Sequence, residues 1–487
     1  MAMTPERTEL APGLDISRLV CGLWQVADLE KDGTLLDPVI AADSLAAYVR
    51  DGFDSFDMAD HYGSAEVITG ELTARSDTPD TVRAFTKWCP EPGPMTAEIV
   101  RAGVQDRLDR LRTTKVDLLQ FHWWSFDDPR WLDALRHLQA LQAEGLIGAI
   151  GVTNFDAIHL EVALAEGIPI VSNQVSFSLV DRRAAGDLTA LCARWGVRLL
   201  AYGTLSGGFL SSRWLGKPEP VDIPDWSRMK YKRFIDQAGG WDAFQTLLGA
   251  ADRIARKHGV SLSNVASRWV LEQPAVAATI IGARISENEH RADNLNVFGF
   301  ALDADDHAVL DAAFTGMPMI AGDCGDEYRK PPFLTASGDL SHHLNAIAPV
   351  YPASPDAALP DRARVLTHSK WEPVAGYCRA MRVGNRVLVS GTTATHGDDH
   401  AVAPQNAAAQ ATYVLDKIVA AVRAHGGAPE HIVRTRVYLT DIDDCDAVAR
   451  VHGRFFGDVQ PANTLLQVAA LAGPYKVEIE AEAVIPD

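Results

Sequence analysis

Short β-prone runs alternate with amphipathic helical stretches from Ser17 to about Val297, and this alternation constrains the fold more than any other feature of the chain. Strands separated by helices pair in parallel, because the crossover helix carries the chain back to the start of the next strand. Eight such strands over roughly 250 residues are typical of a closed barrel. We therefore predict an α/β fold, a (β/α)8 TIM barrel, within residues 1–344. The expected strands cover residues 19–26, 53–58, 82–88, 115–123, 147–155, 168–176, 197–204 and 277–283.

The connection between the seventh and eighth expected strands, about residues 211–275, is long for such a barrel. It contains the segment GKPEPVDIPDW, whose proline and glycine content predicts an irregular loop. This loop either borders the mouth of the active site or is a passive excursion, and the sequence favours the two equally.

A different pattern follows the barrel. Residues 345–365 are rich in proline and alanine and are predicted to be a linker. Beyond them, two short strand-like runs meet at Gly384 and Asn385, a pair typical of a hairpin turn. A long helical stretch, a strand-like run, a second helix and two more strand-like runs come next. Residues 366–487 are therefore predicted to form a small α+β domain.

Composition narrows the classes of protein. The length of 487 residues suits two or three domains. The formal net charge of -19 argues against a nucleic-acid partner, because phosphate binding needs a basic surface. No run approaches the roughly 20 apolar residues of a membrane helix and no signal peptide is recognisable, so we expect a cytoplasmic protein without a membrane partner. The six cysteines are scattered without a CxxC motif, so we expect reduced thiols and no metal site.

Four polar residues lie where predicted strands end or shortly after. Asp57, Lys87 and His122 close strand runs, and Tyr62 lies in the loop after Asp57. The carboxyl ends of barrel strands meet on one face, where the active sites of this fold lie. The pKa of a tyrosine is roughly 10, and a neighbouring lysine, held charged by an aspartate, is expected to lower it. A nearby histidine would orient a carbonyl oxygen, so the four side chains predict a proton donor for a carbonyl that receives hydride.

Hydride transfer needs a cofactor, because no side chain carries hydride. No GxGxxG motif follows the first strand, so a Rossmann-type site is not indicated. Residues 8–335 instead resemble the aldo-keto reductase superfamily, through the motifs GFDSFDMADHYGSAEVITGE, FTKW and LLQFHWW. This resemblance implies that the catalytic tetrad is Asp57, Tyr62, Lys87 and His122, with Tyr62 as the general acid.

The same resemblance implies a site for the nicotinamide half of a cofactor. Thr153 and Asn154 in GVTNF, with Gln174 in SNQVSF, resemble the residues that hold the nicotinamide carboxamide. Tyr202 in LLAYGTLSGG resembles the aromatic residue that stacks on the nicotinamide ring. Trp24 is expected beside this site.

The phosphate half of the cofactor is implied in the same way. The backbone of residues 203–210 resembles the pyrophosphate loop, and IIGARISENEHRADNL resembles the segment that binds the adenosine phosphate. There Arg284 is expected to pair with a 2′-phosphate and Asn294 to contact the adenine, which favours NADP(H) over NAD(H). The loop residues assigned to the cofactor are Gly203, Leu205 and Gly207.

Tryptophans suggest the character of the substrate pocket. Trp24 and Trp123 are predicted to line an apolar pocket, whereas Trp124 is predicted to lie in the core.

Residues from about 371 to 487 resemble the Rid family, also called YjgF-like. The resemblance is carried by RVGNRVLVSGTTA, TRVYLTDIDD, VHGRFFGD and VEIEAEAVI. It implies a chorismate-mutase-like α+β domain that forms homotrimers with clefts between subunits. Family members hydrolyse enamines and imines with an arginine that binds the substrate carboxylate. Here the segment QPANT places Asn463 at that arginine's position, whereas Glu478 matches an acidic residue near the family's water site.

We therefore expect an NADP(H)-dependent oxidoreductase that interconverts a carbonyl, aldehyde or ketone, and an alcohol. The missing arginine favours a Rid-like domain that forms trimers or binds a ligand without a carboxylate. Two other readings stay open. In one, the Rid-like domain organises an oligomer whose barrel binds cofactor without turnover. In the other, the protein is bifunctional and the Rid-like cleft processes an imine or enamine intermediate.

Overall fold

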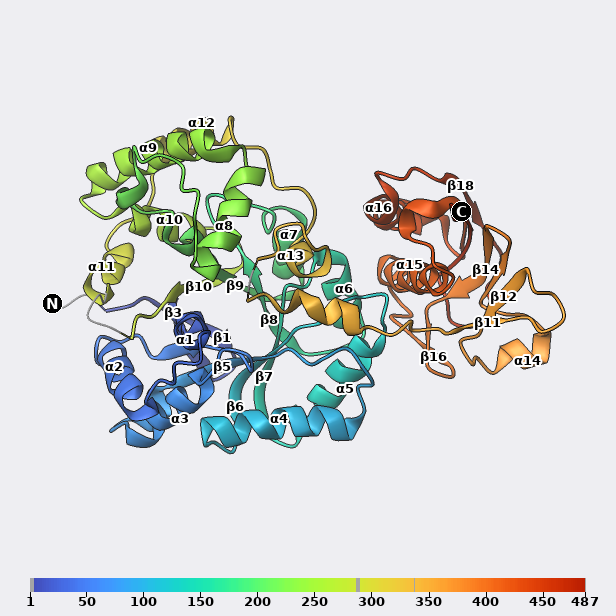
Figure 1. Ribbon diagram of the computed structural model, residues 1–487, viewed down its shortest axis with the longest axis horizontal. Coiled ribbons are helices and arrows are strands. Elements are labelled where there is room, and N and C mark those ends of the chain that lie inside the picture. The colour runs from blue at the N-terminus through green and yellow to red at the C-terminus, as the bar shows by residue number, and fades with distance from the viewer. Residues whose placement is uncertain (1–3, 286–289, 337, 487) are drawn as a thin grey trace.

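The computed structural model describes residues 4–285, 290–336 and 338–486. Figure 1 shows a larger body, in which helices surround a group of strands, beside a smaller body that contains the C-terminus. Among the described residues, no helix has both the length and the apolar content needed to cross a membrane.

The larger body is built on a closed barrel of eight parallel strands, which confirms the predicted (β/α)8 fold. The ring closes where Gly22 of the first strand pairs with Gly282 of the last. Each strand lies within or close to the range expected from the sequence, and most are shorter. The strands are β3 (Leu19–Gly22), β4 (Ser55–Asp57), β5 (Arg83–Trp88), β6 (Val116–Phe121), β7 (Ile147–Thr153), β8 (Ile170–Ser176), β9 (Arg198–Tyr202) and β10 (Val276–Gly282).

Helices cover the outside of the barrel (Figure 1). Polar side chains begin several of them: Thr96 accepts a hydrogen bond from the N–H of Ile99, and Asp156 accepts one from the N–H of His159. Such caps satisfy backbone donors that the first turn of a helix leaves unpaired. The helices between consecutive strands, up to β9, are α1 (Trp24–Glu30), α2 (Pro38–Arg50), α3 (Ala65–Arg75), α4 (Ala97–Leu111), α5 (Arg130–Ala143), α6 (Ala157–Ala165) and α7 (Asp187–Trp195).

A hairpin that was not among the expected elements precedes the barrel. Strands β1 (Arg7–Ala11) and β2 (Leu14–Ser17) pair antiparallel, and Leu10, Leu14 and Ile16 are buried in a cluster with Phe85 and Leu118. These two barrel residues lie near the amino ends of β5 and β6. The hairpin therefore fills the amino end of the barrel and leaves the opposite end for a site.

The long connection between β9 and β10 is largely helical. It contains α8 (Trp226–Gln237), α9 (Gly240–His258) and α10 (Leu262–Leu271). Along α9 the buried residues Leu247, Ala251 and Ile254 follow a helical spacing, so one face packs on the barrel body. Only the first part of the insertion is the irregular loop that its proline content predicted.

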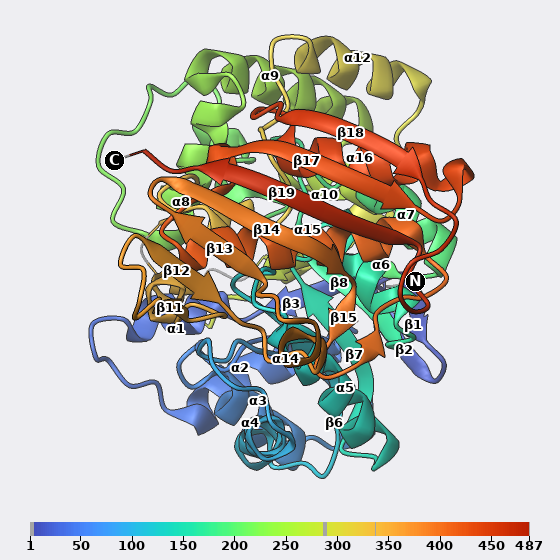
Figure 2. The same cartoon turned by 90° about the vertical axis from the view of Figure 1, so that its right-hand side faces the viewer.

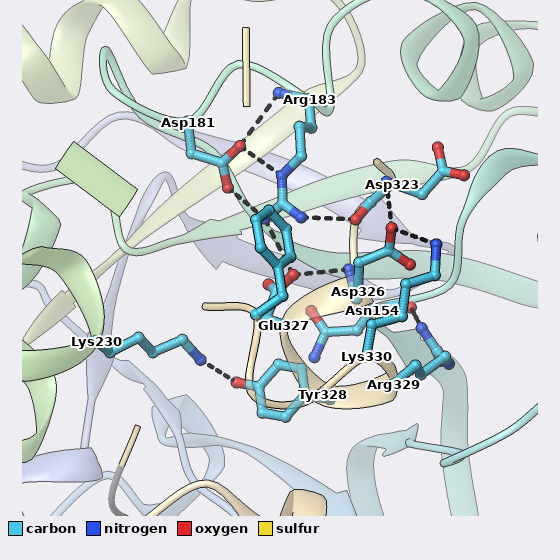
Figure 3. A network of polar contacts seen from close by, with 12 residues as sticks. Asn154, Asp181, Arg183, Lys230, Asp323, Asp326, Glu327, Tyr328, Arg329 and Lys330 are labelled. Carbon is cyan, nitrogen blue, oxygen red and sulfur yellow. Dashed lines mark hydrogen bonds and ion pairs between the residues drawn. The ribbon is translucent and has the colours of Figure 1, made fainter. Parts of the chain in front are cut away.

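After α11 (Arg291–Leu295) and α12 (Ala304–Phe314), the chain returns to the carboxyl end of the barrel. We call residues 315–336 and 338–346 the return segment. It contains the short helix α13 (Asp326–Arg329) and a 3₁₀ helix (Leu340–Ala346). Its ion pairs and hydrogen bonds to the barrel are drawn in Figure 3.

The smaller body is an α+β domain, as predicted. Its seven-stranded sheet is faced on one side by α15 (Ala407–Ala424) and α16 (Cys445–Phe456), and Figure 2 shows its other side uncovered. The short helix α14 (Trp371–Ala375) precedes the expected hairpin at Gly384 and Asn385. In spatial order the strands are β11 (Ala353–Pro355), β12 (Arg362–Val365), β13 (Ala380–Val383), β14 (Arg386–Thr393), β19 (Val477–Val484), β17 (Ile432–Leu439) and β18 (Ala462–Gln467); β15 (Thr395–His396) and β16 (His400–Ala401) form a separate pair.

The expected linker at residues 345–365 needs a correction, because β11 and β12 lie within it and belong to the sheet. β12 pairs antiparallel with β13, and Val365 is fully buried at its end. The run Arg-Ala-Arg-Val alternates polar and apolar residues as a half-buried strand does. The proline-rich composition around it concealed this short pattern.

The two bodies touch through α6 of the barrel and α15 of the sheet domain. His159 Nε2 lies 3.1 Å from Asp416 Oδ2, and the His159 ring stacks on Phe126 with a centroid distance of 3.8 Å. His159 also contacts Asp156, and the two carboxylates raise the pKa of His159 to about 9 against the opposing effect of its burial. A charged, buried histidine therefore joins the two bodies.

Candidate active site

A cavity of about 750 Å³ opens at the carboxyl end of the barrel strands. Its wall contains all four tetrad residues predicted from the sequence and all ten residues assigned to the cofactor. The loop GKPEPVDIPDW also reaches it, through Asp225 and Trp226, so this loop borders the mouth. The predicted residues along the wall are Asp57, Tyr62, Lys87, His122, Trp24, Thr153, Asn154, Gln174, Tyr202, Gly203, Leu205, Gly207, Arg284 and Asn294.

An ion pair between Asp57 and Lys87 lies at the base of the cavity. Lys87 Nζ donates to Asp57 Oδ2 at 2.7 Å and to the carbonyl of Met58 at 2.8 Å. The other carboxylate oxygen of Asp57 accepts from Gln120 Nε2 at 3.0 Å and from Gln174 Nε2 at 2.6 Å. Each charge is therefore hydrogen-bonded, as a buried pair requires.

Tyr62 stands beside this pair. Its ring centroid lies 4.8 Å from Lys87 Nζ, and the indole of Trp24 packs against it edge-on at 5.0 Å. The pKa of Tyr62 is raised well above its ordinary value, by burial and by the Asp57 carboxylate. We expected Lys87 to lower it, and that expectation was wrong for this state of the site, because the charge of Lys87 is paired with Asp57. The phenol consequently keeps its proton at neutral pH.

His122 ends the same row of side chains. It is 2 % exposed, and among the described residues no group forms a hydrogen bond with its Nε2. Burial, with nearby cations, lowers the pKa of His122 well below its ordinary value, so the ring is neutral. A buried nitrogen without a partner is costly unless a ligand satisfies it. The imidazole can therefore hydrogen-bond to an oxygen atom placed in the cavity.

The ends of β7, β8 and β9 supply the neighbouring wall. Thr153 Oγ1 donates to the carbonyl of Gln174 at 3.0 Å, which ties the two strand ends together. Asn154 has a left-handed backbone with φ of 59°, and its side-chain amide lies 2.8 Å from the hydroxyl of Tyr202. These contacts fix the side chains around one flat ring, that of Tyr202.

The loop after β9 forms a cradle that larger residues would fill. Gly203 and Gly207 have positive φ of 68° and 62°. A Cβ on Gly203 would lie 2.4 Å from the Tyr231 hydroxyl, and one on Gly207 would lie 3.0 Å from the Tyr231 ring. Glycine is required where the chain turns in this way and leaves room for a ligand. The residues present therefore fit the pyrophosphate of a dinucleotide.

Arginines gather at the far end of the cavity. Arg213, Arg228 and Arg284 all line it, and burial together with the other two lowers the pKa of Arg213. Arg228 Nε is buried without a hydrogen-bond partner among the described residues. Such a cluster suits a phosphate. The sequence analysis singled out Arg284 alone, because the other two lie in the insertion. Of the segment around Arg284, residues 286–289 lie outside the described residues.

Helix α13 supports this wall from behind (Figure 3). Glu327 accepts a hydrogen bond from the Tyr202 hydroxyl at 2.8 Å and pairs with Arg183 at 3.0 Å. Arg329 donates to the carbonyl of Asn154 at 2.6 Å. The sequence analysis missed these residues, because they follow the strand–helix repeat and no motif marks them.

The tryptophans lie differently from the expectation. Trp24 and Trp124 line the cavity, whereas Trp123 does not. Trp123 Nε1 donates to the carbonyl of Asp128 at 3.1 Å, and its ring stacks on Phe121. Adjacent residues after a strand point to opposite sides, and the sequence alone did not show which of the two faces the cavity.

A group of possible metal ligands lies beside Tyr62. The ligand atoms of Asp60, His61 and Cys89 are within 4.8 Å of one another. Asp60 Oδ1 is 2.8 Å from His61 Nδ1, and Asp60 Oδ2 accepts from the N–H of Cys89 at 2.7 Å. Hydrogen bonds within the protein account for this grouping.

In the sheet domain, Asn463 and Glu478 do not meet within one chain. They lie on β18 and β19, with β17 between these strands. Asn463 Nδ2 donates to Thr435 Oγ1 at 2.9 Å. Glu478 is opposite Thr393 and Tyr438 in the sheet. A cleft that contains both residues would need more than one chain.

Residues 18–314 match the family model described as aldo/keto reductase family. The chain belongs to the aldo/keto reductase family. Residues 367–485 match a second model, endoribonuclease L-PSP, so a Rid-type domain follows the reductase barrel. The aldo/keto reductase family comprises oxidoreductases of carbonyl or alcohol groups, and these enzymes generally use nicotinamide cofactors.

Individual relatives cover mainly the reductase barrel. Aldo-keto reductase YhdN from Bacillus subtilis is 24% identical over 67% of this chain and 98% of its own length. The chloroplastic pyridoxal reductase of Arabidopsis thaliana is 26% identical over 55% of this chain and 75% of its own. The chain spans only 33% of flagellar radial spoke protein 5 from Chlamydomonas reinhardtii, at 32% identity over 32% of this chain.

Two solved structures are similar to parts of the chain. A glycerol dehydrogenase from Gluconobacter oxydans has a TM-score of 0.54 and 24% identity, and the match covers 62% of this chain and 92% of that one. A YjgF-family protein from Mycobacterium tuberculosis is 39% identical over 26% of this chain and 99% of that one, with a TM-score of 0.23. The return segment lies outside both family models.

Proposed function

We propose that this aldo/keto reductase is NADP(H)-dependent and interconverts an aldehyde or ketone with the corresponding alcohol. One observation carries the proposal: His122 Nε2 is buried and has no hydrogen-bond partner among the described residues, and His122 lines the cavity in which Tyr62 stands beside the Lys87–Asp57 pair. A neutral imidazole and a protonated phenol are the donors that a carbonyl oxygen needs.

The substrate oxygen accepts hydrogen bonds from His122 Nε2 and from the Tyr62 hydroxyl. The nicotinamide, when bound, supplies the hydride to the carbonyl carbon. As charge develops on the oxygen, Tyr62 gives it the phenolic proton, and the Lys87 ammonium stabilises the tyrosinate that remains. Asp57 holds the Lys87 side chain in this position. The reverse reaction uses the same groups.

Several residues hold the cofactor in this proposal. Thr153, Asn154 and Gln174 bind the carboxamide, Tyr202 stacks on the nicotinamide ring, and the glycine loop binds the pyrophosphate. Asn294 contacts the adenine, and the arginine cluster favours NADP(H) over NAD(H), because a 2′-phosphate adds charge where three guanidinium groups already gather. Trp24 closes the pocket over Tyr62.

The test is NADPH oxidation by the purified protein with a panel of aldehydes, ketones and α-ketoacids, and NADP⁺ reduction with alcohols and sugars. Turnover should fall by about 100- to 10,000-fold in Tyr62→Phe, because proton transfer in the transition state contributes about 10²–10⁴ in rate. NADPH affinity, followed by fluorescence, should change little. Full activity of Tyr62→Phe would refute the tetrad, and cofactor binding without turnover would favour a sensor barrel.

We further infer that the Rid-type domain assembles three barrels through its open sheet face. That face carries Leu388, Leu466 and Val484, which are 43%, 51% and 38% exposed. Ion pairs such as Arg436–Glu480 lie beside them. Light scattering should give the mass of three chains, and Leu466→Asp should reduce it. A monomeric wild type would refute this arrangement. Imine hydrolysis is not proposed, because Asn463 lacks the charge that binds a carboxylate.

A further inference from the structure

A second Asp–Lys–Tyr set faces the active-site cavity. Lys230 Nζ donates to the Tyr328 hydroxyl at 2.7 Å and lies 3.3 Å from Asp339 Oδ1. The same Nζ lies 4.1 Å from the centroid of the Tyr328 ring. All three side chains line the cavity that contains the tetrad, and Figure 3 shows Lys230 directed at Tyr328.

The set is placed beside the reacting groups. The Tyr328 ring meets the His122 ring edge-on at a centroid distance of 5.2 Å. Lys230 comes from α8 of the insertion, and Tyr328 and Asp339 come from the return segment. The wall opposite Trp24 and the Lys87–Asp57 pair is thus built outside the strand–helix repeat.

One hydrogen-bond donor of this set, the Tyr328 hydroxyl, has no acceptor among the described residues. The Tyr328 oxygen accepts from Lys230, so the phenolic hydrogen must be donated elsewhere. No described residue accepts it, although Tyr328 lines a cavity. Burial raises the pKa of Tyr328 to about 12, so the hydroxyl keeps its hydrogen over the neutral range.

A purely structural contact would not need these groups. Burying an ammonium and a carboxylate costs free energy that an apolar contact between α8 and the return segment would avoid. Lys230 is only 7 % exposed, and Asp339 holds it charged. A charge behind a phenol makes the phenol a stronger hydrogen-bond donor. The Tyr328 hydroxyl is therefore suited to donate a hydrogen bond to an oxygen atom of a ligand in the cavity.

We propose that Tyr328, polarised by Lys230 and Asp339, donates a hydrogen bond to a second oxygen atom of the substrate, so that the enzyme prefers carbonyl compounds with an additional hydroxyl or carbonyl group. The inference rests on the proposed function of the tetrad and deepens it by naming a substrate class. Polyhydroxylated and dicarbonyl compounds belong to this class, and plain aliphatic aldehydes and ketones do not.

The experiment measures kcat/KM for matched aldehydes with NADPH. Propanal is compared with lactaldehyde and 3-hydroxypropanal, and hexanal with 6-hydroxyhexanal, so that the position of the second oxygen is scanned. The oxidation of 1,2-propanediol and of 1-propanol with NADP⁺ is measured as well. We expect the oxygenated partner to be favoured by about 10- to 100-fold, as a hydrogen bond with a charge-assisted donor provides.

The decisive variant is Tyr328→Phe, in which the ratio within each pair should fall close to one. The ratio is measured because a general loss of activity cancels in it. Tyr413→Phe is the matched control: Tyr413 is a buried tyrosine of α15 whose hydroxyl lies 2.7 Å from His396 Nδ1, and its loss should leave the ratio as in the wild type. NADPH affinity of each variant is measured by fluorescence.

Two results would overturn the inference alone. One is equal kcat/KM of the wild type for the oxygenated and the plain aldehyde of each pair, and the other is a kcat/KM ratio that does not change in Tyr328→Phe, including the case in which that variant loses NADPH affinity. That case would assign the phenol to the cofactor. A wild type that turns over no member of either series would overturn the function proposed for the tetrad, and this inference with it.

Discussion

Asp57 is held by more groups than the tetrad contains. Gln120 and Gln174 both donate to the oxygen that Lys87 leaves free. Gln120 is fully buried and occupies the strand position two residues before His122, so it points to the same side of β6. The position of the Asp57 carboxylate is therefore fixed by two amides as well as by Lys87.

The arginine cluster gives a prediction for the cofactor. Arg284→Ala should weaken NADPH binding by about 10- to 100-fold, because it removes a charge-assisted hydrogen bond from a phosphate, and NADH binding should change far less. Fluorescence titration with both cofactors measures the two effects. Arg256→Ala, on the exposed side of α9, is the control, with its side chain 77% exposed. Equal losses for NADPH and NADH would show that Arg284 does not read the 2′-phosphate.

At the scale of single residues, the sequence predicts which side chains form the site better than it predicts their pKa values. The four tetrad residues share one cavity because each is at or just after a strand end, which a βα pattern makes visible. The direction of the Tyr62 pKa was not visible, because it depends on burial and on the pairing of Lys87 with Asp57. Tyr328 and Lys230 were not visible either, since they lie 98 residues apart and outside the repeat.

Helix α13 is short, but its side chains hold several residues of the cavity wall in place. Glu327 and Arg329 reach Tyr202 and Asn154, and Arg183 pairs with both Glu327 and Asp181. Removing one partner of a buried ion pair leaves the other charge uncompensated. The positions of Tyr202 and Asn154 in the cavity wall therefore depend on the stability of the return segment.

The corresponding prediction concerns Glu327→Gln. The change keeps the shape of the side chain but leaves Arg183 with one carboxylate, so the free energy of unfolding should fall by about 3 kcal/mol. NADPH affinity should fall too, because Tyr202 loses an anionic acceptor. Thermal unfolding and fluorescence titration measure the two. Met319→Ala, at a residue of the return segment that is 51% exposed, should change neither. A Glu327→Gln protein as stable and as tightly binding as the wild type would contradict the role given to α13.

Elements with a regular period were predicted, and those without one were not. The eight barrel strands and the hairpin at Gly384 follow clear patterns. The hairpin of β1 and β2 and the strands β11 and β12 have at most five residues each, too few for alternation to stand out from their surroundings. Tertiary pairing, which the sequence pattern does not contain, makes them strands.

At the scale of the whole molecule, the contact between barrel and sheet domain depends on pH. The pKa of His159 is raised to about 9 in the folded protein, against an ordinary value of 6.5. The stabilisation from its charge is thus complete below pH 6.5 and is lost as the pH rises through about 9. The unfolding temperature should fall over this range, as measured by calorimetry.

Asp416→Asn tests the assignment, because it removes the carboxylate from the sheet domain and should flatten the fall between pH 6.5 and 9. The control is His307→Gln, which removes a histidine whose side chain is 42% exposed. A pH dependence that is the same in Asp416→Asn and in the wild type would show that another group titrates.

No described residue after Leu340 lines the cavity of the barrel, so none of the sheet domain belongs to its wall. The hollow of about 630 Å³ in the sheet domain is lined by residues between Arg364 and Met381 and shares none with it. Within one chain, the described residues line no common passage, so under the proposed function a compound that leaves the barrel would cross solvent before it met the sheet domain. A scavenger added to the solution could intercept the compound in the solvent. Fusion of the two domains brings them close together but gives the compound no protected passage.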